Sequence, residues 1–94
     1  MALDAPIQSK AVIGPNAVLQ TEAALVEAGG RNLAEQVFAA AGLSHLLTDR
    51  PGAMIDEALP KALFAALFAT APRDEAVHIA HRAGELTGAY ILRN

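Results

Sequence analysis

The chain has 94 residues, which is enough for one domain. Its formal net charge is −3, and its seven Lys and Arg residues are scattered, so no basic stripe exists that would favour nucleic-acid binding. The absence of cysteine excludes disulfides, zinc–thiolate sites and thiol nucleophiles.

The N-terminal part combines an irregular arm with a well-marked helix start. Residues 1–12 show no periodicity, and we expect a flexible arm ahead of a helical domain of residues 13–94. A first helix is predicted over residues 15–28, because Gly14 lets the backbone turn and Pro15 supplies a helical φ. The glycines at 29 and 30 should end it in a left-handed cap. Three side chains of this helix are expected to be buried: Val18, Leu25 and Val26.

The middle of the chain predicts a second helix followed by a turn. Asn32 is a favourable N-cap, and Gly42 marks the C-terminal end. Residues 43–48 indicate a short helical turn. The Asp-Arg-Pro-Gly sequence at residues 49–52 is typical of a β-turn, and residues 53–59 lead into the next helix.

A third helix, with Pro60 near its first turn, is apolar on all sides. One face carries Leu63, Phe64, Leu67 and Phe68, and the other is alanine. The chain has no Trp and only four aromatic residues, so its own core should be thin. We therefore expect the second side of this helix to contact another chain.

The last helix is predicted to begin at Pro72 and to run to Leu92 or Arg93, with Asp74 and Glu75 favouring its N-terminal dipole. Small residues recur in it every four positions and form a groove for another helix: Ala76, Ala80, Gly84 and Gly88. Strand signals are nearly absent. The predicted fold is all-α, a single small domain of about four helices.

Catalytic signatures are weak throughout. Glu75 and His78 stand at the i, i+3 spacing of a carboxylate–histidine metal pair, but one chain lacks the second pair that a di-iron bundle requires. Neither serine lies in a nucleophile elbow, and no phosphate-binding or dinucleotide-binding loop is present. We expect no metal, no cofactor and no catalytic residue, and hence a chain that is not itself an enzyme.

Three stretches carry a family resemblance: residues 13–20 (Ile-Gly-Pro-Asn-Ala-Val-Leu-Gln), residues 52–58 and residues 84–92. Together they resemble the N-terminal half of the bacteriochlorophyll 4-vinyl-reductase-like family, whose longer members continue into a mixed α/β half. At this length the chain is similar to the small accessory subunits of the aerobic magnesium-protoporphyrin IX monomethyl ester oxidative cyclases of purple bacteria.

This resemblance implies a supporting role in bacteriochlorophyll biosynthesis and photosynthesis. The redox chemistry that forms the fifth ring of the macrocycle would belong to a di-iron cyclase catalytic subunit, the expected protein partner. The docking surface is predicted to comprise the third and last helices, through Leu63, Leu67, Ala80, Gly84 and Gly88.

The expected cellular location of the chain rests on its composition and on the expected partner. Residues 1–10 lack the features of a secretory signal, and the longest uncharged apolar run, residues 62–71, is too short to cross a bilayer. We therefore expect a cytoplasmic chain without a transmembrane segment, held at the periphery of the photosynthetic membrane through its partner.

Two alternatives stay open. One is a tetrapyrrole carrier that contacts the Mg-porphyrin substrate, its slot lined by Phe64, Phe68 and Tyr90 and capped by His78 or His81, since chlorophyll-type magnesium accepts imidazole. The other is a helical dimerisation or scaffold module, active as a homodimer.

Overall fold

The computed structural model describes residues 12–93, with side chains over residues 13–89. The elements in chain order are β1 (Val12–Ile13), α1 (Asn16–Ala40), α2 (His45–Thr48), β2 (Ile55–Asp56), α3 (Ala58–Thr70) and α4 (Arg73–Arg93). The all-α prediction is confirmed. The predicted arm of residues 1–12 lies outside the described residues except for Val12, which pairs with Asp56 in a short antiparallel ladder.

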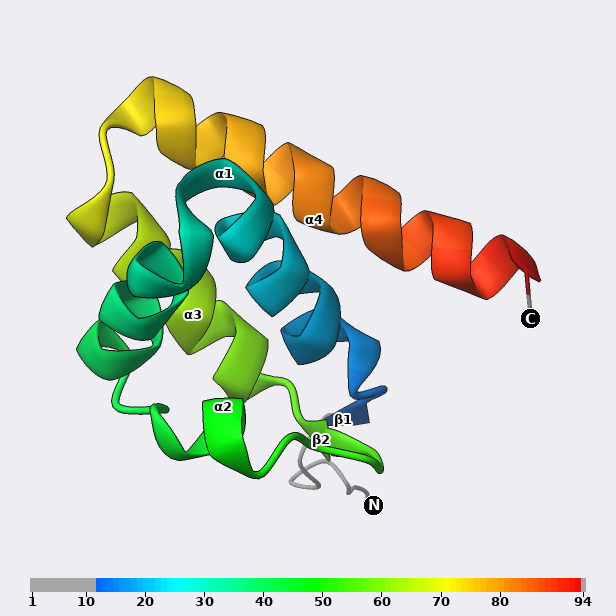
Figure 1. The fold of residues 1–94 in the computed structure, drawn as a ribbon. Helices are drawn as coiled ribbons and strands as arrows, with labels where there is room; N and C mark the ends of the chain where they lie inside the picture. Colours follow the sequence, from blue (N-terminus) through cyan, green and yellow to red (C-terminus); the bar gives the residue numbers. More distant parts are fainter. Residues whose placement is uncertain (1–11, 94) are drawn as a thin grey trace, which may run out of the picture.

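Helix α1 is two helical segments joined at one residue. Gly30 has φ 78° and ψ −177°, whereas helical geometry holds on both sides of it. This backbone is extended at positive φ, so the predicted break is confirmed but the predicted left-handed cap is not. Figure 1 shows the chain turning at this point, so that the second segment (residues 31–40) packs beside α3.

The end of α1 is a glycine cap. Gly42 has φ 75°, the Leu43 N–H donates to the Phe38 carbonyl at 2.8 Å, and the Gly42 N–H donates to the Ala39 carbonyl at 3.0 Å. This pair of bonds is the Schellman motif, and its hydrophobic contact partners, Phe38 and Leu43, are both buried. The sequence prediction for this helix end is confirmed.

Helix α1 is the central element of the core and packs against α3, α4 and α2. The largest fully buried side chains come from the three long helices: Val18, Thr21, Leu25, Val37, Phe38, Leu63, Leu67 and Ile79. Val26, predicted to be buried, is 39% exposed because it lies off the stripe that faces α3 and α4. In Figure 1 the last turns of α4 extend beyond the other helices, consistent with extents of 49 × 31 × 27 Å.

Candidate functional site

Two residues of the predicted docking surface belong to the core. Leu63 and Leu67 are each 0% exposed, because this face of α3 packs on α1. Neither side chain can contact a partner in this conformation, so the predicted surface is corrected at both positions. The exposed side of α3 carries Ala65, Phe68 and Ala69 instead.

Two of the other predicted docking residues, Ala80 and Gly84, line a groove between α1, α3 and α4, and Gly88 lies one turn further along α4. A hollow of about 250 Å³, which we call the small-residue groove, is lined by Ala17, Thr21, Phe64, Ala80, Ala83, Gly84 and Thr87. A neighbouring hollow of about 240 Å³ shares Ala17 and Thr87 with it and reaches Ile13. A Cβ atom placed at Gly84 would meet nothing within 4 Å, so the groove is open there, and the same holds for a Cβ at Gly88 beyond its end.

The polar residues of the groove are satisfied within their own helices. The Thr21 hydroxyl donates to the Ala17 carbonyl at 2.6 Å, and the Thr87 hydroxyl donates to the Ala83 carbonyl at 2.9 Å. Both threonines therefore leave their methyl groups for packing. Despite two hydroxyls, the groove is an apolar surface.

The described residues of the proposed tetrapyrrole slot do not line one common hollow. Phe64 lines the small-residue groove, whereas His78 lines a separate hollow of about 220 Å³ beside Glu27, Glu75 and Arg82. Phe68 is 41% exposed on α3. His81 is exposed and lies 3.7 Å from the Glu85 carboxylate. The side chain of Tyr90 lies outside the described residues.

An ion pair joins α1 to α4 at the edge of the histidine-lined hollow. Arg82 Nε and Nη2 donate to the two carboxylate oxygens of Glu27 at 2.8 and 3.2 Å. Hydrogen bonding to Arg82 lowers the pKa of the Glu27 carboxyl group. The same bond raises the pKa of Arg82.

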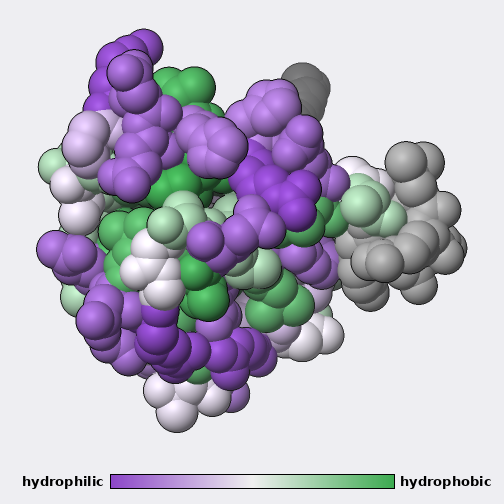
Figure 2. All heavy atoms as spheres, turned by 45° about the horizontal axis from the view of Figure 1, so that its top comes forward, coloured by the Kyte–Doolittle hydropathy of each residue, from purple (hydrophilic) through white to green (hydrophobic). Residues whose placement is uncertain are grey.

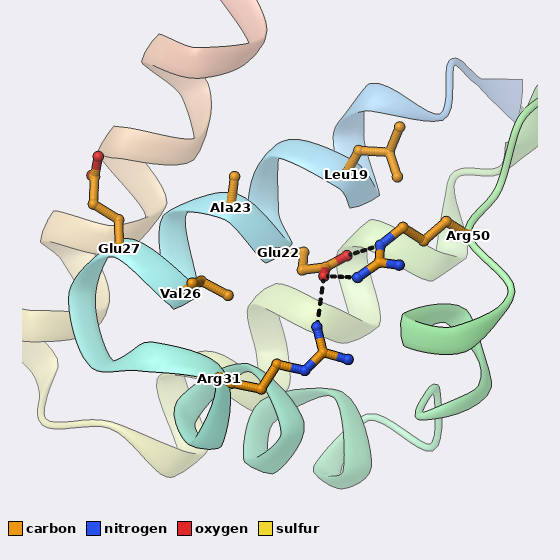
Figure 3. Close-up of a pocket in the computed structure, with 7 residues that line it drawn as sticks. All are labelled: Leu19, Glu22, Ala23, Val26, Glu27, Arg31 and Arg50. Carbon is orange, nitrogen blue, oxygen red and sulfur yellow. Dashed lines mark hydrogen bonds and ion pairs between the residues drawn. The ribbon is translucent and has the colours of Figure 1, made fainter.

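One hollow beside the first segment of α1 was not predicted. We call it the arginine hollow; it measures about 570 Å³ and is lined by Leu19, Glu22, Ala23, Val26, Glu27, Arg31 and Arg50. Figure 3 shows the side chain of Glu22 between two guanidinium groups, one from the second segment of α1 and one from the loop after α2. The Glu22 side chain is only 10% exposed.

The geometry at Glu22 is a bidentate fork with an additional contact. Arg50 Nε donates to Oε1 at 2.9 Å and Arg50 Nη2 to Oε2 at 2.6 Å, while Arg31 Nη1 lies 3.5 Å from Oε2. The hydrogen bond and the charge of Glu22 raise the pKa of Arg50. A buried carboxylate needs such partners, because an unpaired buried charge is strongly unfavourable.

The sequence does contain a signal that Glu22 forms a buried ion pair. Val18, Thr21, Glu22 and Leu25 follow the i, i+3, i+4, i+7 spacing of one buried helix face. A glutamate on that face requires a cationic partner. Arg50 could not be identified as that partner, because it is 28 residues away in a predicted turn.

Two arrangements that active sites often use are not found among the described side chains. Between residues 13 and 89 no hydrogen bond joins a hydroxyl group to a histidine. In the same part of the chain no group of three or more His, Asp or Glu side chains is arranged to hold a metal ion. Of the described helices, none has both the length and the apolar character needed to cross a membrane.

Exposed apolar side chains are dispersed. Figure 2, which looks toward α4, shows apolar surface lying between polar side chains on that face of the molecule. Among residues 13–89 the exposed large apolar residues are Ile13, Val26, Met54, Phe68 and Val77. Comparisons with protein-family models, with curated proteins and with solved structures found no match to this chain.

Proposed function

We propose that this chain is a non-catalytic accessory subunit that supports the di-iron oxidative cyclase of bacteriochlorophyll biosynthesis. The resemblance of residues 13–20, 52–58 and 84–92 to the accessory-subunit family supports this identity. The chain would act by binding the catalytic subunit, which performs the oxidation, and by stabilising or presenting it to substrate.

The open small-residue groove is the observation that carries the docking part of this proposal. Ala80 and Gly84 present almost no side chain, and Ala17 faces them across the groove. Small residues let two helix backbones approach closely, which increases van der Waals contact along the whole interface. A helix of the catalytic subunit would lie over Phe64 and extend toward Gly88, one turn further along α4.

Substituting Gly84 with leucine separates docking from folding. Because a Cβ at this position meets nothing within 4 Å, Gly84→Leu should fold, and leucine should favour the helix by about 0.8 kcal/mol over glycine. The larger side chain would fill the groove and exclude a partner helix. We expect the variant to be at least as stable as the unaltered chain but no longer to co-purify with the cyclase catalytic subunit. Cyclase activity should fall below about a tenth of its level with the unaltered chain, which corresponds to a loss of about 1.4 kcal/mol in binding free energy.

Ala89→Leu is the matched control, because Ala89 is exposed on α4 and lies outside the groove. This variant should retain both co-purification and cyclase activity. If Gly84→Leu keeps both as well, the groove is not the docking surface. If it instead converts a dimer to a monomer in sedimentation experiments without affecting cyclase activity, the groove belongs to a second copy of this chain.

A further inference from the structure

The arginine hollow has hydrogen-bond donors that the fold leaves unused. Arg50 donates from Nε and Nη2 to Glu22. Arg31 contacts Glu22 through Nη1 and Glu35 through Nε, each at 3.5 Å. Figure 3 shows Nη1 of Arg50 and Nη2 of Arg31 outside the dashed bonds. The two arginine side chains are 46% and 52% exposed, so these nitrogens can reach a ligand.

Two guanidinium groups are more than Glu22 needs. The fork from Arg50 alone satisfies both carboxylate oxygens, at 2.9 and 2.6 Å. Arg31 adds only a long 3.5 Å contact to Oε2. Glu22 thus holds two planar cations at the hollow, each with one nitrogen left to donate to a ligand carboxylate.

The helix segment that carries Glu22 also supplies the apolar lining of the hollow. Leu19, Ala23 and Val26 follow one another along the first segment of α1 at the i, i+4, i+7 spacing, and Val26 is 39% exposed. Glu27 also lines the hollow, but its carboxylate is bonded to Arg82. A volume of about 570 Å³ is within the usual range for a small-molecule site.

We infer that the arginine hollow binds an amphipathic organic carboxylate, with its carboxylate on Arg31 and Arg50 and its apolar body against Leu19, Ala23 and Val26. The acidic side chains at the hollow balance the arginines in charge, so the attraction comes from directed N–H groups rather than from a net positive field. We therefore expect a dissociation constant between roughly 10 μM and 1 mM. The inference is independent of the proposed function, because the hollow and the small-residue groove share no residue.

The test is a fluorescence titration of the full chain with 1-pyrenebutanoate, compared with the neutral alcohol 1-pyrenebutanol. The carboxylate should bind saturably with one site per chain, and the alcohol about fivefold or more weaker, since it lacks the charge that the guanidinium groups recognise. Equal affinity for the two probes would overturn the inference, because it would show adsorption on apolar surface alone.

Arg31→Gln is the informative variant, because Glu22 keeps the whole fork of Arg50 and the fold is not left with an unpaired buried carboxylate. It should weaken pyrenebutanoate binding about fivefold and leave pyrenebutanol binding unchanged. Val26→Ser should weaken both probes. Arg73→Gln removes the same charge at an exposed position outside the hollow and should change neither. Unchanged carboxylate binding in Arg31→Gln, or an equal loss in Arg73→Gln, would contradict the site.

Discussion

The glycine pair at the break in α1 has two different structural roles. A Cβ atom at Gly29 would lie 2.9 Å from the Leu33 Cβ atom, so this position is restricted by close approach. A Cβ at Gly30 would meet nothing within 4 Å, but its φ of 78° with ψ near 180° is a conformation that side-chain-bearing residues rarely adopt. Gly30 is therefore restricted by its backbone alone, and it sets the direction of the second segment of α1.

Gly30→Ala should destabilise the chain by about 1–3 kcal/mol, because alanine would strain this backbone or shift the segment that carries Arg31, Val37 and Phe38. Urea unfolding followed by circular dichroism would measure the loss. Gly52→Ala is the matched control: it has no positive φ and open space at its Cβ, so the exchange should cost little or be slightly stabilising. Equal stabilities for the two variants would show that the conformation at Gly30 is not required.

Among the elements, α1 and α4 combine apolar packing with a peripheral ion pair. Ala76, Ile79 and Ala83 of α4 are buried, while Arg82 reaches Glu27 of α1 at one edge of this contact. The hydrogen bond to Arg82 lowers the pKa of Glu27 below its ordinary value of 4.5, and the charge of Arg82 acts in the same direction. The pair therefore stabilises the contact only when Glu27 is ionised.

The sign of the pH dependence follows from this lowered pKa. The stabilisation is fully present above the ordinary value of 4.5 and is lost as the pH falls through the lower pKa of the folded state. Arg82→Gln should reduce the urea midpoint slightly at neutral pH and make it less sensitive to acid between about pH 5 and pH 3. Lys61→Gln, which removes the ion pair between α3 and its N-cap residue Glu57, should keep the acid sensitivity of the unaltered chain. If Arg82→Gln loses as much stability in acid as the unaltered chain, the acid sensitivity comes from groups other than the Glu27–Arg82 pair.

The sequence predicts where these elements begin and end better than it predicts which sides they bury. Helix ends follow from local chemistry, such as Pro15, Gly42 and Pro72, and the structure confirms them. Burial depends on where distant helices lie. Leu67 and Phe68 were expected on one face, yet Leu67 is 0% and Phe68 is 41% exposed. The β1–β2 pair was also missed, because two-residue strands show no alternation.

The candidate sites also combine features that follow from local sequence with features that depend on how distant segments pack. The groove along α4 was predictable from the spacing of Ala80 and Gly84, which lie on one helix. Its opposite wall, with Ala17, and the arginine hollow both require the packing of separate segments. Glu22 meets Arg50 from a distance of 28 residues, and no local pattern encodes that meeting.

For the molecule as a whole, a small core leaves little stability in reserve. A domain of this size has a free energy of unfolding of roughly 5–15 kcal/mol. Most of the largest fully buried side chains in the described part belong to α1, which packs against both α3 and α4, so a cavity there affects all three helices. Truncation of a core residue should therefore unfold the chain as a unit rather than release a single helix.

Leu67→Ala and Phe68→Ala test this arrangement as a matched pair on adjacent positions of α3. Leu67→Ala should cost about 2–5 kcal/mol, since it removes a fully buried side chain and leaves a cavity. Phe68→Ala removes a larger but partly exposed side chain and should cost about 1 kcal/mol or less. Urea unfolding at two protein concentrations measures both. If the two variants lose similar free energies of unfolding at both protein concentrations, α3 is rotated about its axis relative to the orientation described above. A large cost for Phe68→Ala that rises with concentration would mean instead that a second copy of the chain covers Phe68.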